Sequence, residues 1–249
     1  MSEVLLLDED DIMYNSEMND EEKYLGHLEE IYTFIGHSEH FMLKKLQLDQ
    51  FYYTKTVSPH ILSQALCRIE EVDLIDTSLT APQARELFTS ISENQELKLR
   101  KLRGFDVEKL ILQSIPPETF ARAMIRLEEV DVPYKASEEQ LGCLFTAIAT
   151  SKECKLRNIV LCSDLLMDIS TEIFSQAITR LEEVDLMDSI VEPEQIKAVF
   201  TAIARDKDFS LRLKIIRAFS HFPCHFDFSS CVKPKILRQV KKRVLIEQN

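Results

Sequence analysis

The sequence predicts an α/β fold made of repeats, in which short parallel strands alternate with helices. Three near-identical heptapeptides begin at Arg68, Arg126 and Arg180, which are 58 and 54 residues apart. Each reads Arg-Ile/Leu-Glu-Glu-Val-Asp-Leu/Val. Self-similarity at a nearly fixed spacing indicates that one strand-and-helix unit is copied along an axis, so that each copy packs on its neighbours.

Two kinds of helix are predicted between the heptapeptides, because apolar residues there recur at helical spacing. The first kind contains a shared Phe-Thr-Ser/Ala-Ile pattern and occupies residues 84–91, 141–148 and 196–203. The second kind opens on Pro or Thr and occupies residues 59–66, 117–124 and 171–178. The period therefore splits into two alternating half-units of about 28 residues. We expect Phe88, Phe145 and Phe200, all in the first kind of helix, to be interior.

Each half-unit opens with apolar residues spaced three and then two apart, and eight such units can be traced. Ile69, Val72 and Leu74 show this spacing, and Leu79 follows with Thr77 at a polar position before it. We expect Val72 and Leu74 to lie on a short strand with both side chains turned inward. The polar side chain is expected to hydrogen-bond the backbone of the turn that leaves the strand.

This spacing, Leu-x-x-Leu-x-Leu-x-x-Asn-x-Leu, resembles that of leucine-rich repeat proteins of the ribonuclease-inhibitor-like class, over roughly residues 41 to 222. Similar repeats form part of nucleotide-binding immune receptors. The resemblance implies a horseshoe-shaped solenoid with parallel strands on the concave side, helices on the convex side, and a protein partner on the concave surface. Gly104 departs from the pattern, because it stands where a strand Leu is expected.

The two ends of the chain differ in charge. Residues 1–30 carry eleven acidic residues against Lys23 alone, which is −10 of the total formal charge of −12. We divide the chain into an acidic, degenerate N-terminal cap with a partial repeat (1–40), repeats of two alternating types (41–232), and a basic C-terminal capping helix or tail (233–249). Ends of opposite charge also allow weak head-to-tail self-association.

Composition and hydropathy argue against a membrane-spanning protein and against a nucleic-acid-binding protein. No apolar run approaches the roughly 20 residues that span a bilayer, and the six cysteines are scattered through the repeats, as expected in a reducing compartment. We therefore expect a cytoplasmic protein, with the nucleus as an alternative through the basic tail. The net charge of −12 argues against nucleic-acid binding, because affinity for phosphates depends on Lys and Arg surfaces.

Catalytic and metal sites are not expected. His221, Cys224, His225 and Cys231 fall within eleven residues, but they supply only part of a paired zinc motif. We interpret them as packing residues of a degenerate last repeat. The repeated Glu-Glu-x-Asp carboxylates are interpreted as structural, because a general acid and base need two different environments. We predict no enzyme activity, no cofactor and no metal.

Strand positions expected to point out of the sheet alternate in charge. Arg100, Lys101 and Arg103 stand between Glu70, Glu71 and Asp73 on the preceding strand and Glu128, Glu129 and Asp131 on the next. Neighbouring strands lie about 4.8 Å apart, so opposite charges can pair across them. The pattern turns partly apolar toward the C-terminus, which suggests an apolar anchor for a partner there. The candidate partner-binding residues are Arg103, Asp131, Val160, Asp185, Leu213 and Ile215.

The function that the sequence favours is therefore a protein-protein interaction module or scaffold, which binds a partner through the concave or C-terminal surface. An inhibitor or GTPase-regulating protein acting on an enzyme through the same surface is the alternative. The two differ in whether a single Arg or carboxylate carries the effect, and the sequence does not separate them.

Overall fold

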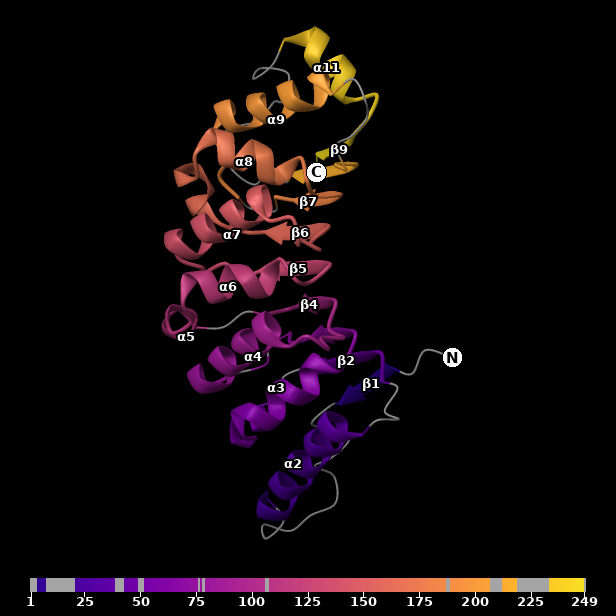
Figure 1. Ribbon diagram of the computed structural model, residues 1–249, viewed down its shortest axis with the longest axis vertical. Coiled ribbons are helices and arrows are strands. Elements are labelled where there is room, and N and C mark those ends of the chain that lie inside the picture. The colour runs from indigo at the N-terminus through magenta and orange to yellow at the C-terminus, as the bar shows by residue number, and fades with distance from the viewer. Residues whose placement is uncertain are drawn as a thin grey trace.

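One parallel sheet runs the length of the molecule, and helices pack along one of its faces (Figure 1). The computed structural model describes residues 4–7, 21–38, 43–48, 52–75, 77, 79–105, 108–186, 189–206, 212–218 and 233–248. Within these residues the strands follow one another across the sheet in sequence order, and every neighbouring pair is parallel. The predicted α/β class is confirmed.

The elements are short and alternate along the chain. The strands are β1 (Val4–Leu7), β2 (Lys45–Leu48), β3 (Glu71–Asp73), β4 (Lys101–Arg103), β5 (Glu129–Val132), β6 (Asn158–Leu161), β7 (Glu183–Asp185), β8 (Ile215–Ala218) and β9 (Leu245–Gln248). The helices are α2 (Glu21–His37), α3 (Pro59–Cys67), α4 (Ala81–Glu93), α5 (Lys109–Gln113), α6 (Pro117–Met124), α7 (Glu138–Thr150), α8 (Thr171–Ile178), α9 (Pro193–Arg205) and α11 (Pro234–Val240). The 3-10 helices η1 (Tyr52–Thr56) and η2 (Asp164–Asp168) precede α3 and α8.

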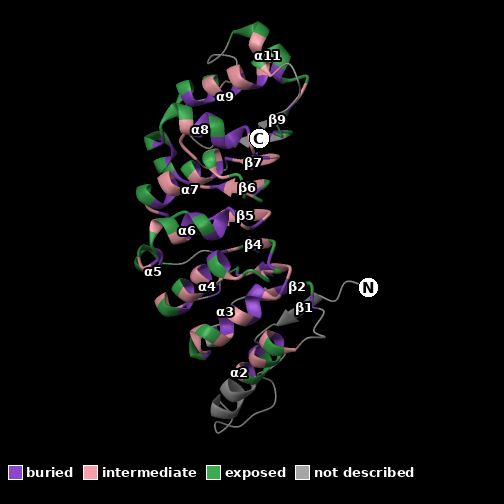
Figure 2. Cartoon of the chain, in the orientation of Figure 1, coloured by how far each residue is buried: buried purple, intermediate pink, exposed green. Residues whose placement is uncertain are grey.

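The hydrophobic core is a continuous layer between the sheet and the row of helices. Successive helices lie side by side, from α2 against α3 to α9 against α11. Along the strands burial alternates: Val72, Val130 and Val184 are buried, whereas the residues on either side of each are only half-buried. Figure 2 shows the buried residues where helices face the sheet and each other. Within the described residues, helices therefore cover only one face of the sheet.

A buried glutamine links each of the helices α4, α7 and α9 to the half-unit before it. Gln140, in the first turn of α7, donates from Nε2 to the carbonyls of Leu112 and Ile115, at 2.9 and 3.1 Å. Its Oε1 accepts the backbone N–H of Ser137, which caps the helix. Equivalent bonds are made by Gln83 to Thr54 and Val57, and by Gln195 to Leu166 and Ile169. The carbonyls of Thr54, Leu112 and Leu166 also accept a backbone N–H of their own turn. Each glutamine therefore matters most for the second carbonyl of its pair, at Val57, Ile115 or Ile169.

The arginine of each heptapeptide caps the C-terminal end of a helix in an earlier unit. Arg126 donates from Nη1 and Nη2 to the carbonyls of Ser92 and Asn94, at the C-terminal end of α4. Arg68 reaches Gly36 and Ser38 after α2 in the same way, and Arg180 reaches Ala149 and Ser151 after α7. A cation at a helix C-terminus also opposes the negative end of the helix dipole. The repeated arginine is therefore a structural residue that links neighbouring units.

Gly104 departs from the repeat because the chain turns at this point. Its φ is +63°, and a Cβ there would lie 2.6 Å from both Asp73 Oδ1 and the backbone nitrogen of Ile75. The left-handed turn brings the next residue, Phe105, into the core, where its ring centre lies 5.1 Å from that of Phe88. Phe105 thus replaces the missing Leu.

The predicted polar position hydrogen-bonds backbone as expected, but its shorter bonds go to the end of the preceding strand rather than to the turn that leaves its own strand. The hydroxyl of Thr77 donates to the carbonyl of Leu48, at 3.1 Å, and the hydroxyl of Ser189 donates to the carbonyl of Leu161, at 2.9 Å. Both bonds join the end of one strand to the segment that leaves the next. They extend the register between units beyond the strands themselves.

The two termini differ from the sequence-based expectation. Within the predicted degenerate N-terminal cap, Val4–Leu7 forms a strand, β1, that pairs with β2. At the other end, the helical spacing of Ile236 to Leu245 predicts a single helix, whereas α11 ends at Val240 and Leu245–Gln248 pairs with β8. The sheet therefore extends closer to both ends of the chain than predicted.

We expect Phe145→Ala to lower the free energy of unfolding by about 3–5 kcal/mol, the range for deleting a buried aromatic ring. Phe145 is fully buried and stacks on Phe174, with ring centres 5.5 Å apart. Urea denaturation followed by circular dichroism measures the change, and Tyr134→Ala, at an exposed aromatic residue, is the control. A loss for Phe145→Ala no larger than that of the control would contradict this packing.

Candidate functional site

The helix-free face of the sheet presents two rows of outward side chains. The strand registers align Glu71 with Lys101 and Lys101 with Glu129 in the first row. The second row aligns Asp73 with Arg103, and farther along it aligns Asp131, Val160, Asp185 and Arg217. Since all these positions lie on strands of one sheet, the rows form one continuous surface (Figure 1).

Opposite charges pair between neighbouring strands at β3 to β5, as the alternation predicts. Lys101 Nζ lies 2.7 Å from Glu71 Oε1. Arg103 forms an ion pair with Glu129, with a distance of 2.7 Å between its Nε and Glu129 Oε1. Just before the strands, Arg100 and Glu128 approach to 3.7 Å. These residues form a charge ladder that helps to hold the strands in register.

The environment of the sheet shifts the pKa of two carboxyl groups on its helix-free face, Glu71 and Asp131. The hydrogen bond from Lys101 lowers the pKa of the Glu71 carboxyl below its ordinary value. Asp131 shows the opposite behaviour, because burial raises its pKa even though its Oδ2 accepts the backbone N–H of Gly104 at 3.2 Å. Asp131 is thus a half-buried carboxylate at the C-terminal end of β5.

The predicted partner-binding residues differ in how exposed their side chains are and in which face of the sheet they lie on. Arg103 is exposed and paired with Glu129, whereas Asp131, Val160 and Asp185 are half-buried on the helix-free face. Leu213 was predicted to point outward, and this is wrong: its side chain is only 5% exposed. Ile215 lies in β8 opposite Glu183, and its side chain falls outside the described residues.

The error at Leu213 is a misassigned position within the repeat. The β7–β8 register aligns Glu183 with Ile215, so Leu213 corresponds to Leu181, the first inward residue of the preceding unit. The outward position beside Asp185 belongs to Arg217 instead. The expected apolar anchor toward the C-terminus is therefore limited to Val160 among the described side chains of these candidates.

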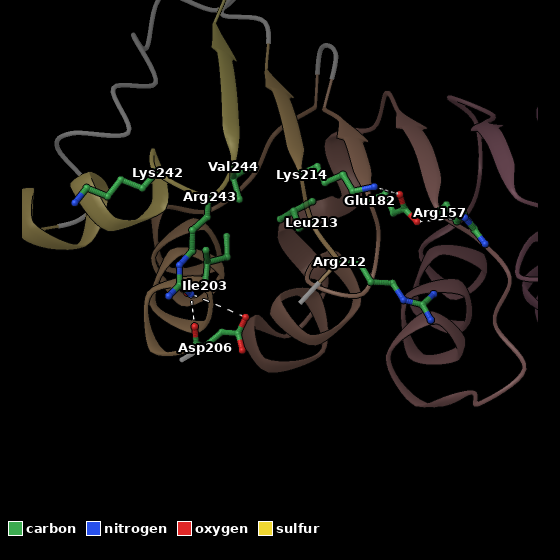
Figure 3. A pocket seen from close by; sticks show the side chains of 10 residues that line it. All are labelled: Arg157, Glu182, Ile203, Asp206, Arg212, Leu213, Lys214, Lys242, Arg243 and Val244. Atoms are coloured by element: carbon green, nitrogen blue, oxygen red, sulfur yellow. Dashed lines mark hydrogen bonds and ion pairs between the residues drawn. The ribbon is translucent and has the colours of Figure 1, made fainter. Parts of the chain in front are cut away.

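A cleft that the sequence analysis missed lies at the C-terminal end of the sheet, where the chain enters β6 to β9 (Figure 3). Its volume is about 660 Å³. The buried side chains of Ile203, Leu213 and Val244 supply its apolar part. The charged residues of this basic cleft are Arg157, Arg212, Lys214, Lys242, Arg243, Glu182 and Asp206. The signal in the sequence was a cation just before the strand in alternate units, namely at Arg157 and Lys214, with Glu182 at the same position in the unit between them.

Ion pairs at Glu182 organise one wall of the cleft. Glu182 lies 2.5 Å from Lys214 Nζ and 3.4 Å from Arg157 Nη1. The hydrogen bond from Lys214 lowers the pKa of Glu182, so this carboxylate stays ionised. On the other wall Arg243 donates to the carbonyls of Ile203 and Asp206 (Figure 3). With five cations against two carboxylates, the cleft has an excess of positive charge.

Groups for nucleophilic or metal chemistry are not assembled in the described part of the chain. Cys67, Cys143 and Cys154 are free thiols. Burial raises the pKa of the Cys67 thiol to about 12, which makes it a poor nucleophile. No group of three His, Cys, Asp or Glu side chains could hold a metal ion among the described residues. The His221, Cys224, His225 and Cys231 grouping lies outside these residues.

Comparison with known proteins gives no family assignment. No protein-family model matches the chain, and no curated protein matches it. Among the described residues, none of the helices has the length and apolar character needed to cross a bilayer.

We expect the triple variant Arg100→Glu, Lys101→Glu and Arg103→Glu to lower the free energy of unfolding by about 1–3 kcal/mol in low salt, because three exposed pairs contribute up to about 1 kcal/mol each. The loss should shrink in high salt, which screens exposed charges.

Thermal unfolding at low and high NaCl measures this difference. The control reverses Lys98, Lys152 and Lys155, three exposed lysines, and so makes the same change in net charge. An equal loss at both salt concentrations, or an equal loss in the control, would show that the charge ladder does not stabilise the sheet.

Proposed function

We propose that this chain is a protein-protein interaction module, built as a leucine-rich repeat solenoid, that binds a protein partner on the helix-free face of its sheet. The observation that carries the proposal is the uncovered face itself. Parallel sheets are normally covered on both faces, whereas here burial alternates along every strand whose side chains are described from β2 to β7. A half-buried, uncovered sheet surface of this kind suits contact with another protein.

The residues at the centre of this face indicate what kind of partner surface would bind there. Val160 stands between Asp131 and Asp185 in the second outward row, and Asn158 stands between Glu129 and Glu183 in the first. A half-buried apolar side chain among four carboxylates suits a partner surface with an apolar residue surrounded by Lys or Arg. Because Arg103 already pairs with Glu129, part of this acidity is neutralised within the sheet. We call the six residues around Val160 the central acidic patch: Glu129, Asp131, Asn158, Val160, Glu183 and Asp185.

The proposal is tested with a double variant, Asn158→Lys and Val160→Lys, which places two cations in the central acidic patch. The matched control is Leu110→Lys with Gln113→Lys, the same two kinds of change at exposed positions of α5. Both variants are first shown to fold by circular dichroism. Each is then used, with the unaltered chain, for quantitative affinity capture from a lysate of the source cells.

The proposal predicts that a defined set of captured proteins is lost with the patch variant and kept with the control. The purified captured protein should bind the unaltered chain directly, and more weakly as NaCl rises, because the contact is electrostatic. Equal capture by both variants would place the binding surface elsewhere and contradict the proposal.

A further inference from the structure

The basic cleft combines positive charge with an apolar floor, on a protein that is acidic overall. Its five cations outnumber its two carboxylates, whereas the whole chain has a formal net charge of −12. Three side chains form the floor, and Ile203, Leu213 and Val244 are only 2%, 5% and 3% exposed. A cleft whose charge is opposite to that of its surroundings concentrates ligands of the other sign. An anionic ligand with an apolar part therefore suits this cleft.

The basic cleft is long, and it follows the edge of the sheet at which the strands begin. Its lining residues include Arg157 just before β6, Glu182 before β7, Lys214 before β8 and Val244 before β9. Four neighbouring strands, each about 4.8 Å from the next, together cover about 14 Å. An extended peptide advances about 3.3 Å per residue, so about four to five residues cover this distance. The shape of the cleft thus favours an extended peptide over a compact ligand.

Three of the five cations already have partners within the protein. Lys214 and Arg157 both pair with Glu182. Arg243 donates to carbonyl groups at the end of α9, where it acts as a helix cap. The charge of these three residues is therefore largely used in holding the walls of the cleft together.

The other two cations are available to a ligand. Within the part of the chain that the structure describes, Arg212 and Lys242 are exposed and form no ion pair. Figure 3 shows their side chains on opposite sides of the floor at Leu213 and Val244. Cations that stand apart, with apolar groups between them, match a ligand in which two separate carboxylates flank an apolar group.

The two carboxylates of the cleft, Glu182 and Asp206, disfavour a dense polyanion such as a polyphosphate. The hydrogen bond from Lys214 lowers the pKa of Glu182, so this residue is negatively charged at neutral pH. A polyphosphate brings several negative charges close to it, whereas an acidic peptide carries single charges at intervals. A phosphate also lacks an apolar group that could cover the floor of the cleft.

We propose that the basic cleft binds an extended acidic peptide of a partner protein, in which an apolar residue lies between two carboxylates. One carboxylate pairs with Arg212 and the other with Lys242, and the apolar side chain between them packs on Leu213 and Val244. This is a second binding site, independent of the central acidic patch. The patch has the opposite charge, so one acidic peptide does not suit both surfaces.

The experiment begins with a library of random short peptides displayed on phage, which is selected on the purified full chain. The most enriched sequences are synthesised with a fluorescent label, and fluorescence anisotropy gives their dissociation constants. The cleft variant is Arg212→Glu with Lys242→Glu. The matched control is Arg122→Glu with Lys152→Glu, which reverses one Arg and one Lys at exposed positions of α6 and of the segment after α7. Circular dichroism first shows that both variants fold.

The enriched peptides should share two Asp or Glu residues that flank an apolar residue. The cleft variant should raise their dissociation constants by about tenfold or more, while the control leaves them unchanged. Replacing the two acidic residues of a peptide by Asn or Gln should weaken binding to a similar extent. High NaCl should weaken it as well, because it screens exposed charges.

Any of four results would overturn the proposal. The selection enriches no sequence, or it enriches sequences without the acidic and apolar pattern. The enriched peptides bind the cleft variant as tightly as the unaltered chain. Sodium tripolyphosphate, used as a competitor, binds the cleft more tightly than the best peptide, which would make the ligand a phosphate. The binding of a protein to the central acidic patch is tested at other residues, so its outcome is separate.

Discussion

The structure depends on buried side chains that hydrogen-bond the backbone of a neighbouring unit. A repeat of strand, loop and helix leaves carbonyl groups unpaired wherever a helix ends or a loop turns inside the stack, and an unpaired buried carbonyl costs about 1–3 kcal/mol. Gln83, Gln140 and Gln195 satisfy the loops before the short helices, and Arg68, Arg126 and Arg180 satisfy the ends of the long ones. These bonds reach from one unit to another, so they hold the units in a fixed order as well as stabilising each.

The uncovered face of the sheet is a consequence of this arrangement. Because the helices are held to one side by their own neighbours, nothing in the described chain has to cover the other side. The outward rows can therefore carry charged side chains. Some of these charges pair with each other within the sheet, Glu71 with Lys101 and Arg103 with Glu129. The remainder, around Val160, is the surface through which we propose that the molecule meets another protein.

Much of the architecture could be predicted from the sequence, because the same sequence pattern recurs in several units. The spacing of Val72 and Leu74, the interior Phe145 and the alternation of charge each recur, and a recurring pattern is specific even when one copy is degenerate. Features that occur only once in the chain were harder to predict. Leu213 was placed outward because its unit is irregular, and only the strand register assigns it to the core. The basic cleft was also not predicted, because its lining residues come from the segments that enter β6 to β9 and from the end of α9, which lie far apart in the sequence.

The most direct measurement of the central claim is the stability of Gln140→Leu, which keeps the volume of the side chain and removes its bonds to Leu112, Ile115 and Ser137. The control is Gln176→Leu, at an exposed position of α8. If bonds between units hold the stack together, urea denaturation will show a loss of about 1–3 kcal/mol for Gln140→Leu, because the carbonyl of Ile115 loses its donor while that of Leu112 keeps the N–H of Ile115, and almost none for the control. A loss no greater than that of the control would mean that apolar packing alone orders the repeats.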